Sequence, residues 1–480
     1  MTWSFDGRGF FGKAGLFFAL ATVLGSIPAQ AEEQEAHKGT LQNWELYGSV
    51  RLQTAYWNRY KWYKKVNSTT SSDSNFFINH PIGSTLQDTL PITAMQMGLQ
   101  NNSYFGVRGK GEKFGFGFEM GLGTFLQGVG LEGVDWDERS LSQSKRLSTF
   151  MRKIYGDWYI NQYATLRIGQ DWNIANFFIS NQVFNSDAGL GYSGILYTGR
   201  KPQLKLSVGG KYLEAMSWKA QAAIIKQDVY NLPSSFGVSG YLGTTEEKLP
   251  KFEFGGEVGY EISKLLGVGA KAVGGIAQYD AVIYKEDDLS LTGNRRAAIK
   301  SNLLGVNLDL RVWKVKTSLT YARGQNLGSY GVWLGNPDAP ITDPSMVMFY
   351  PWPEIVYDSL GVPTGDVKIY NAKTWQGGAV INVQALPWLA VEGGIGQVQT
   401  DHEDTTYIRT LDYNPATGFG NLNGFERLAY YGNLQITVAD GHFQIVPEFS
   451  FSDLGGFQKS RTNEAGGKWY SYALKLELDI

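Results

Sequence analysis

The residues that most often carry catalysis or bind metals are few in this sequence of 480 residues. Its four histidines, His37, His80, His402 and His442, are far apart, and none has the His-Glu-x-x-His spacing of a zinc site. The chain has no cysteine, which excludes thiolate chemistry. The acidic run at 401–404 lacks the glycine and spaced oxygens of a calcium loop. We therefore expect no enzyme and no cofactor, although a serine–histidine pair distant in sequence stays open.

Charged side chains that alternate with apolar ones indicate a different chemistry. Segment 469–480 places tyrosine, leucine and isoleucine on one parity and Lys475, Glu477 and Asp479 on the other. This period of two is typical of a strand with one apolar and one polar face. About ten tilted residues of such a strand span a bilayer. In a soluble sheet a second layer would cover the apolar face, but in a membrane barrel the polar face would line an aqueous lumen.

In the other strands, the same parity predicts which polar side chains face the lumen. Some of them are neutral, and the charged ones include both signs. They are Arg51, Gln53, Gln96, Gln100, Tyr104, Arg108, Lys110, Glu119, Arg167, Lys205, Lys219, Glu253, Glu257, Lys271, Asp309, Arg311, Glu392, Glu448, Lys475 and Glu477. Because both signs are present, the pattern favours a transverse field across a pore over a filter of one sign. The alternative for each residue is a solvated wall position without effect on selectivity.

The pattern predicts about sixteen strands, joined alternately by short turns and long connections. The expected strands are 44–60, 92–111, 114–122, 152–160, 165–171, 203–212, 218–226, 252–261, 268–277, 298–312, 318–323, 379–385, 389–394, 428–438, 443–450 and 469–480. An even number of antiparallel strands with short turns on one side is typical of bacterial transmembrane barrels. The last strand is expected to pair with the first, because a closed ring leaves no strand edge unpaired.

Composition agrees with many closely spaced strands and interfacial aromatic rings. The chain has 59 glycines, 27 tyrosines, 26 phenylalanines and 14 tryptophans, but only 15 prolines. Trp158, Trp218, Trp313 and Trp388 lie beside predicted short turns, as an aromatic girdle requires, although chance could place some of them there. The net charge of −2 gives no support to nucleic-acid binding.

The N-terminal segment has the pattern of a secretory signal peptide. Arg8 and Lys13 precede an apolar run, and Ala29 and Ala31 offer small residues before a cleavage point. We expect a signal peptide at 1–31, with an uncleaved anchor as the alternative, and a barrel domain at 32–480. Because the part after residue 31 contains no apolar run of about 18 residues, no spanning helix is expected there.

Three short stretches resemble the trimeric porins of Gram-negative outer membranes. They are Asn-Ser-Tyr-Phe-Gly-Val-Arg-Gly at 102–109, Arg-Lys-Ile-Tyr-Gly-Asp-Trp at 152–158 and Leu-Arg-Ile-Gly-Gln-Asp-Trp at 166–172. The resemblance covers about a third of the chain. Tyr104 stands where the family usually has an arginine of its basic wall. The resemblance implies a bacterial outer-membrane location, contact with lipid and a homotrimer.

The resemblance also implies that a third loop folds into the barrel and narrows it. The corresponding segment is 172–201, and Asp187 would be its acid facing the basic wall. Without the family, a connection of about thirty residues is still long enough to expect order or function. For Arg152 the parity predicts the face of Ile154, whereas the resemblance predicts the lumen, so either a place above the membrane or a β-bulge is required.

These observations predict an all-β transmembrane barrel that passes small hydrophilic solutes and ions by diffusion. The expected constriction residues are Arg51, Gln96, Tyr104, Arg108, Lys110, Glu119, Arg167 and Asp187. Two alternatives remain. One is a channel or exporter specific for an oligosaccharide or an organic acid, with aromatic residues of 324–374 stacking on sugars. The other is a non-conducting barrel that serves as a scaffold.

Overall fold

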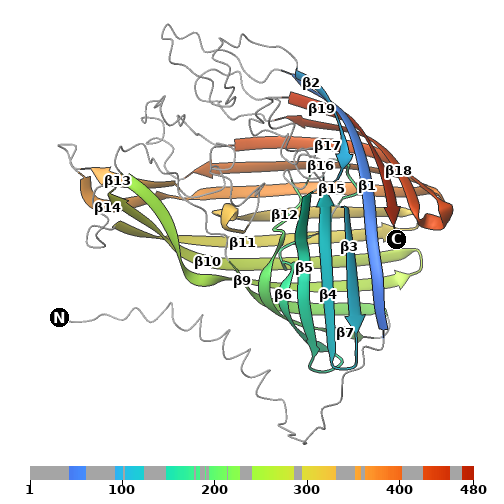
Figure 1. Cartoon of the computed structure of the whole chain (residues 1–480), viewed down its shortest axis with the longest axis horizontal. Helices are drawn as coiled ribbons and strands as arrows, with labels where there is room; N and C mark the ends of the chain where they lie inside the picture. The colour runs from blue at the N-terminus through green and yellow to red at the C-terminus, as the bar shows by residue number, and fades with distance from the viewer. Residues whose placement is uncertain are drawn as a thin grey trace, which may run out of the picture. The chain divides into compact units, whose positions relative to one another are not determined.

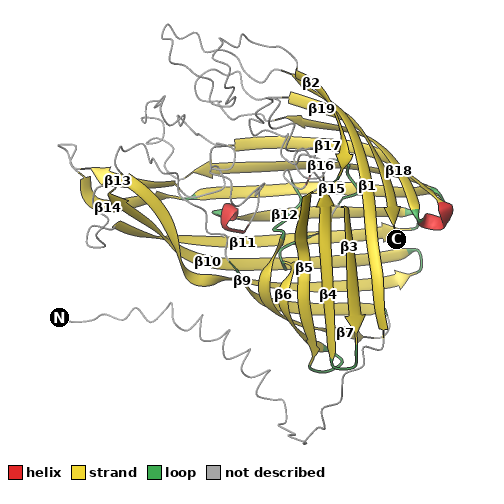
Figure 2. Cartoon of the chain, in the orientation of Figure 1, coloured by secondary structure: helices red, strands yellow, loops and turns green. Residues whose placement is uncertain are grey.

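In the computed structural model, the described part of the protein consists mainly of long antiparallel strands (Figures 1 and 2). The structure describes residues 43–60, 92–100, 103–123, 148–177, 180–183, 190, 194–212, 215–226, 241–285, 295–330, 352–357, 363–402, 425–453 and 468–479. The predicted signal peptide and the domain boundary after residue 31 lie outside these ranges. No helix in the described ranges has the length and hydrophobicity needed to cross a bilayer.

The strands follow one another along the sequence with two short 3₁₀ helices between them. The strands of the large sheet are β1 (Asn43–Tyr60), β2 (Ile92–Leu99), β3 (Ser103–Lys110), β4 (Phe114–Gly123), β5 (Ser148–Tyr159), β6 (Ala164–Trp172), β7 (Arg200–Tyr212), β8 (Met216–Ile225), β9 (Tyr241–Ser263), β10 (Leu266–Lys285), β11 (Arg295–Val312), β12 (Val315–Gln325), β15 (Ala372–Leu386), β16 (Leu389–His402), β17 (Phe425–Val438), β18 (Phe443–Asp453) and β19 (Lys468–Asp479). The helices are η3 (Leu327–Tyr330) and η4 (Ala439–Gly441).

Most strands of the large sheet pair with their neighbours in sequence, β12 pairs with β15, and the sheet closes on itself. Strand β19 pairs with β1 from Ser49 opposite Asp479 to Tyr60 opposite Lys468. The sheet contains seventeen strand segments, but β2 and β3 lie end to end along β1 and share one position. The ring therefore has sixteen antiparallel positions, which confirms the predicted number and the predicted pairing of the last strand with the first.

Three features of the strands differ from the prediction. The single strand expected at 92–111 is divided into β2 and β3, and β9 begins at Tyr241, earlier than expected. A separate hairpin, β13 (Trp352–Tyr357) with β14 (Pro363–Tyr370), was not predicted. The break between β2 and β3 adds two residues relative to β1. Because this number is even, side chains of one parity face the same side of the sheet before and after the break.

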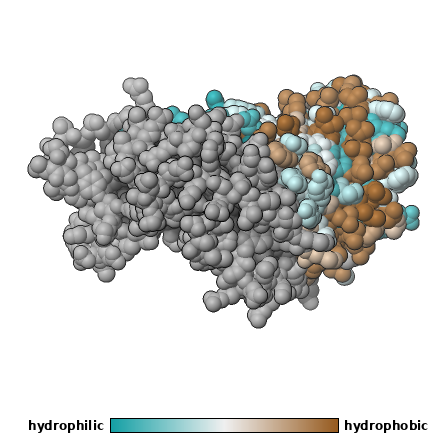
Figure 3. Space-filling view, turned by 90° about the horizontal axis from the view of Figure 1, so that it is seen from above, coloured by the Kyte–Doolittle hydropathy of each residue, from teal (hydrophilic) through white to brown (hydrophobic). Residues whose placement is uncertain are grey.

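The outer face of the ring is apolar and the inner face is polar. On β11 the outward side chains Leu304, Val306, Leu308, Leu310 and Val312 are between 41% and 52% exposed. Figure 3 shows brown, hydrophobic surface on the described part of the barrel. The inner parity of the same strand carries Ser301, Asn307 and Asp309. An apolar face of this size without a second covering layer is typical of a wall that meets hydrocarbon.

Short turns lie at one end of the barrel. The connections from β9 to β10 and from β11 to β12 are two residues each, and Trp313 in the second has a positive φ of 52°. Trp158, Trp218, Trp313 and Trp388 are all exposed near this end, at 38% to 65%. The placement of these four tryptophans beside short turns is therefore confirmed. Long connections start at the opposite ends of the strands, as expected.

Candidate functional site

The described residues of the segment between β6 and β7 (173–177, 180–183, 190 and 194–199), called segment 173–199 below, are bound to the inner wall through their backbone. Three glutamates on the polar parity of the wall accept its N–H groups. Glu253 of β9 accepts from Ala175 at 2.9 Å, Glu392 of β16 from Asn181 at 2.8 Å, and Glu448 of β18 from Val183 at 2.5 Å. All three carboxylates belong to buried residues. The described part of this segment therefore contacts the inner face of three strands.

Donors from the wall satisfy carbonyl groups of the same segment. Lys271 of β10 donates to the Asn176 oxygen at 2.5 Å, and Thr320 of β12 donates to the Gly194 oxygen at 2.8 Å. Gln100, which follows β2, donates to the Val183 oxygen at 2.7 Å. Buried backbone groups need hydrogen-bond partners. These side-chain contacts take the place of the backbone hydrogen bonds that a neighbouring strand would provide.

Close packing adds to these hydrogen bonds. Leu190 and Ile195 form a buried cluster with Val380, Ala429 and Tyr431 of the wall. Nearby, Gly194 has a φ of 148°, and a Cβ atom on it would lie 2.5 Å from the Gly377 oxygen and 2.7 Å from the Gly396 Cα. Only glycine fits a positive φ combined with such a close approach.

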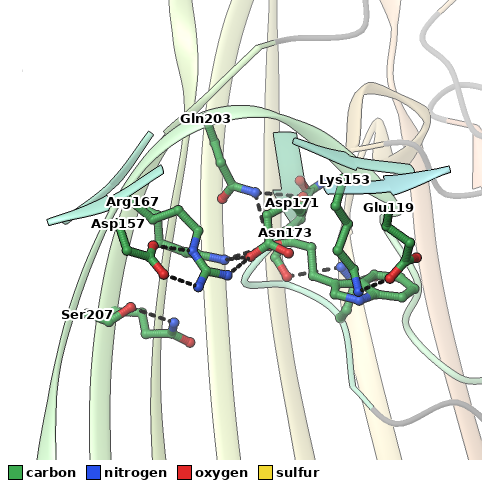
Figure 4. A network of polar contacts seen from close by, with 12 residues as sticks. Glu119, Lys153, Asp157, Arg167, Asp171, Asn173, Gln203 and Ser207 are labelled. Carbon is green, nitrogen blue, oxygen red and sulfur yellow. Dashed lines mark hydrogen bonds and ion pairs between the residues drawn. The ribbon is translucent and has the colours of Figure 1, made fainter. Parts of the chain in front are cut away.

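An ion network joins the start of this segment to β5, β6 and β7 (Figure 4). Arg167 donates through two nitrogens to the Asp157 carboxylate at 2.7 Å each, and through a third to Asp171 at 2.6 Å. Lys205 binds the same oxygen of Asp171 at 2.8 Å. Gln203 donates to the backbone oxygen of Asp171 at 2.7 Å. Such bidentate, charge-assisted bonds fix the direction in which the chain leaves β6.

A second network surrounds Glu119 of β4. Arg152 and Lys153 each lie 2.6 Å from one of its carboxylate oxygens, and the Tyr47 hydroxyl donates to it at 3.2 Å. Both cations reach the same carboxylate because the register of β4 with β5 shifts between Glu119 and Met120. This bulge resolves the question about Arg152, which points to the inner side although its parity predicts the outer one.

Cations on β3, β5, β6 and β7 also lie over aromatic rings. Arg108 lies 5.3 Å from the Tyr47 ring, Lys110 5.6 Å from Tyr159, Arg152 4.7 Å from Tyr104, Arg167 3.7 Å from Tyr155, and Arg200 3.5 Å from Trp172. These distances are in the range of cation–π attraction. One side of the interior therefore carries positive charge together with flat aromatic surface.

The remaining predicted site residues are distributed over this interior. Arg51 pairs with Glu477 of β19 at 2.6 Å and is partly exposed. Arg108 pairs with Glu45 at 2.8 Å, and both side chains are more than half exposed. Arg167 and Glu119 belong to separate networks, because Arg167 is held by two aspartates and Glu119 by Arg152 and Lys153.

Two predicted residues cannot be compared with the structure. Gln96 belongs to β2, opposite Ala55 of β1, but its side chain lies outside the described part. Asp187 lies outside the described residues altogether. The aromatic side chains proposed for sugar stacking, such as Trp333 and Trp352, are also outside it.

The prediction missed Lys153, Asp157 and Asp171 as members of the networks. A signal for all three exists in the parity of their strands: Lys153 and Asp157 share the parity of Tyr155 on β5, and Asp171 shares that of Arg167 on β6. The register shift falls at Arg152 and leaves the face of Lys153 unchanged. The prediction also missed the contact of Arg200 with the Trp172 ring, for which the sequence offers no local signal.

Behind segment 173–199, Lys251 and Glu253 of β9 form a fully buried pair beside η3. Their charged atoms are 3.5 Å apart, and Lys251 lies 5.3 Å from the centre of the Tyr330 ring. Burial, together with the nearby Glu253 carboxylate, raises the pKa of the Tyr330 hydroxyl well above its ordinary value. Tyr330 therefore stays neutral and donates a long hydrogen bond of 3.4 Å to the Ser301 oxygen.

The described residues contain no group of three or more histidine, cysteine, aspartate or glutamate side chains arranged to hold a metal ion. His442 follows η4 in the turn before β18, and its Nδ1 lies 3.2 Å from the Asp479 oxygen. His402 is the last residue of β16.

No family model matches the chain, and no curated protein matches it either. Among solved structures, OprB of Pseudomonas putida has 10% identity and a TM-score of 0.46, with 91% of this chain and 94% of that chain covered. OmpF of Salmonella typhi has 12% identity and a TM-score of 0.44, covering 91% and 97%. An anion-selective porin from Comamonas acidovorans has 10% identity and a TM-score of 0.43, covering 91% and 99%. The closed ring of sixteen strand positions described above is what identifies this chain as an antiparallel β-barrel.

Proposed function

We propose that the chain is a bacterial outer-membrane channel through which small hydrophilic solutes and ions diffuse. The observation that carries this proposal is a closed strand ring with an exposed apolar outer face and a charged inner face, across which segment 173–199 is bound. An apolar wall suits hydrocarbon, and a charged interior suits water. No chemical step is part of the proposal.

Selectivity in this proposal comes from the inner charges that water reaches. Arg108 and Lys110 are exposed, and Glu45, the acid that binds Arg108, is exposed as well. Arg51, Lys153 and Arg167 contribute less, because their side chains are only 20% to 25% exposed and each is bound to a buried acid. Opposed charges at short range produce a field across the pore that acts differently on anions and cations. Gln96, Tyr104, Glu119 and Asp187 remain proposed constriction residues.

The signal peptide at 1–31 and a homotrimer belong to the same proposal. Export through a cleaved signal peptide agrees with a chain that has no cysteine and an apolar outer wall. An apolar barrel wall can pack on copies of itself without exposing backbone groups. The mass of the complex in detergent, measured by light scattering, tests the trimer, and N-terminal sequencing of the exported protein tests the cleavage.

A channel specific for an anionic solute is the second candidate function. It is favoured by the five cations that lie over aromatic rings on β3 to β7. Flat rings beside positive charges can bind the ring face of a sugar or an organic acid and its carboxylate at the same time. General diffusion needs no such arrangement.

Current measurements on the purified full-length protein in planar bilayers test both candidates. Stepwise conductance that no single solute blocks supports general diffusion. Saturable block by one sugar or carboxylate supports the specific channel. Protein that inserts and is folded, as shown by heat-dependent gel mobility, yet gives no conductance contradicts both and supports the non-conducting scaffold.

A further inference from the structure

At the long-connection end of three neighbouring strands, the outward side chains of the barrel change from apolar to polar and positively charged. On β11 the outward parity runs through Leu308, Val306 and Leu304 and then continues with Asn302 and Lys300, both exposed. The register of β11 has no shift against β10 or β12 over this range. Lys300 therefore projects from the same face as the apolar side chains, outside the lumen.

The two strands beside β11 in the ring order repeat this change. On β12 the outward side chains Leu319 and Tyr321 are followed by Arg323, which is exposed. On β15 the outward parity of Ile381 continues through Trp375 to Lys373, which is also exposed. Arg323 lies opposite Trp375, and Gln325 lies opposite Lys373. We call Lys300, Arg323 and Lys373 the cationic patch.

The patch has the arrangement of a membrane interface. Trp375 lies in the same row as Arg323, and tryptophan rings gather at the level of lipid headgroups. Below this row the wall is apolar, and above it are Lys300 and Lys373 with the amide side chains of Asn302 and Gln325. The three cations span two strand spacings, roughly 10 Å across the sheet, which is within the width of a lipid headgroup.

Other charges on this face neutralise only part of the positive charge of the patch. Arg296 is bound to Glu246 at 2.7 Å and is therefore not counted. Asp401 lies opposite Lys373 on β16, so it offsets part of one charge. On β17 and β18 the outward side chains Tyr430 and Phe451 are aromatic and stack at 4.7 Å. The patch is therefore formed by β11, β12 and β15.

We propose that the cationic patch binds the phosphate groups of an anionic lipid in the leaflet at the long-connection end. Lysine and arginine at the level of the headgroups attract phosphate, and arginine can bind it through two nitrogens. The apolar side chains below the patch supply the surface for the acyl chains. This inference needs a membrane-inserted barrel but does not depend on whether the lumen conducts.

Lipid titration of the full-length protein in a neutral, sugar-headed detergent tests the proposal, with bound lipids counted by native mass spectrometry. The probes are diphosphorylated lipid A and its dephosphorylated form. The test variant is Lys300→Gln with Arg323→Gln and Lys373→Gln. The control variant, Lys113→Gln with Lys264→Gln and Lys314→Gln, removes the same charge from turns at the opposite end.

We expect the test variant to bind diphosphorylated lipid A at least about tenfold more weakly than the wild type, and the control variant to bind it equally well. Equal binding by the test variant, or an equal loss in the control variant, would overturn the proposal. So would undiminished binding of the dephosphorylated lipid, or displacement of lipid A by millimolar inorganic phosphate. Because the patch lies outside the lumen, conductance and heat-dependent gel mobility should be unchanged in both variants, which separates this test from that of the channel.

Discussion

At the scale of single residues, two groupings of acids and bases on the inner wall differ in their access to water. The Glu119 side chain is 2% exposed and binds Arg152 and Lys153, whereas Arg108 and Glu45 are 58% and 54% exposed. A charge left without its partner is costly only where water cannot reach it. We therefore expect Glu119 to contribute to the stability of the barrel, and Arg108 to contribute to the electric field that acts on permeating ions.

Replacing Arg108 with glutamate should shift ion preference toward cations. The change removes a positive charge and places a second carboxylate beside Glu45, so we expect the cation-to-anion permeability ratio to rise about two- to threefold. The reversal potential in a salt gradient measures it. Lys113→Glu makes the same change of charge in the short turn before β4 and should have a smaller effect. An unchanged reversal potential in Arg108→Glu would argue against Arg108 lining the conduction path.

Replacing Glu119 with glutamine should destabilise the barrel. Arg152 is buried, so the variant removes the carboxylate that binds its charge at 2.6 Å, at a cost of about 3 kcal/mol. Denaturant unfolding of the protein in lipid vesicles, followed by tryptophan fluorescence, measures the change. Glu45→Gln breaks an exposed pair and should cost less than about 1 kcal/mol. Equal costs for the two variants would contradict the assignment of Glu119 to a buried network.

At the scale of elements, segment 173–199 depends on the inner wall for its conformation. Its N–H groups are bound by Glu253, Glu392 and Glu448, and these glutamates belong to strands on different parts of the ring. Closure of the barrel thus creates the surface that orders the segment. A change that pushes the segment from the wall should leave the strands intact, because their ladders do not include it.

Replacing Gly194 with alanine should release part of this segment. The added Cβ meets backbone of β15 and β16 at less than 3 Å, and alanine is strained at this φ, together about 1 to 3 kcal/mol. Limited proteolysis of protein in vesicles should cleave the segment faster, and current noise should increase. Gly156→Ala, where a Cβ has open space, serves as the control. Cleavage at the wild-type rate in Gly194→Ala would show that Gly194 does not hold the segment in place.

At the scale of the whole molecule, the barrel has its apolar side chains on the outside and its charged side chains on the inside, the reverse of a soluble protein. Leu308 is 52% exposed on the outside, whereas Lys205, Glu392 and Arg427 are buried on the inside. This distribution is stable only if the outer face meets hydrocarbon. A charge added to the two faces should therefore have very different costs.

Replacing Leu308 with arginine should destabilise the barrel in a bilayer by about 2 to 4 kcal/mol, because Leu308 lies in the middle of the outer apolar run of β11. Ser217→Arg adds the same charge at an exposed position on the inner parity of β8 and should cost much less. Unfolding in vesicles measures both. Similar costs for the two variants would contradict contact between the outer wall and lipid.

The sequence by itself determined which side chains face in and which face out along the regular stretches of each strand, and how many strands form the ring. Parity is a local property, so Leu304 and Lys475 could be assigned to opposite faces without knowing their neighbours. Because the alternation is local, the short turns that interrupt it, such as the one at Trp313, were predictable as well. The two-residue break between β2 and β3 had no local signal, and it left the assignment of Arg108 correct only because its length is even.

Tertiary structure alone decided which charges meet. Arg152 points inward because a bulge against β4 changes its parity, and a bulge depends on the partner strand. Glu448 binds Val183, a residue 265 positions away, through a contact that exists only after the ring has closed. The pairing of Arg108 with Glu45 likewise follows from the register of β1 with β3. Local periodicity determines the face on which a side chain lies, but register and closure determine its partner.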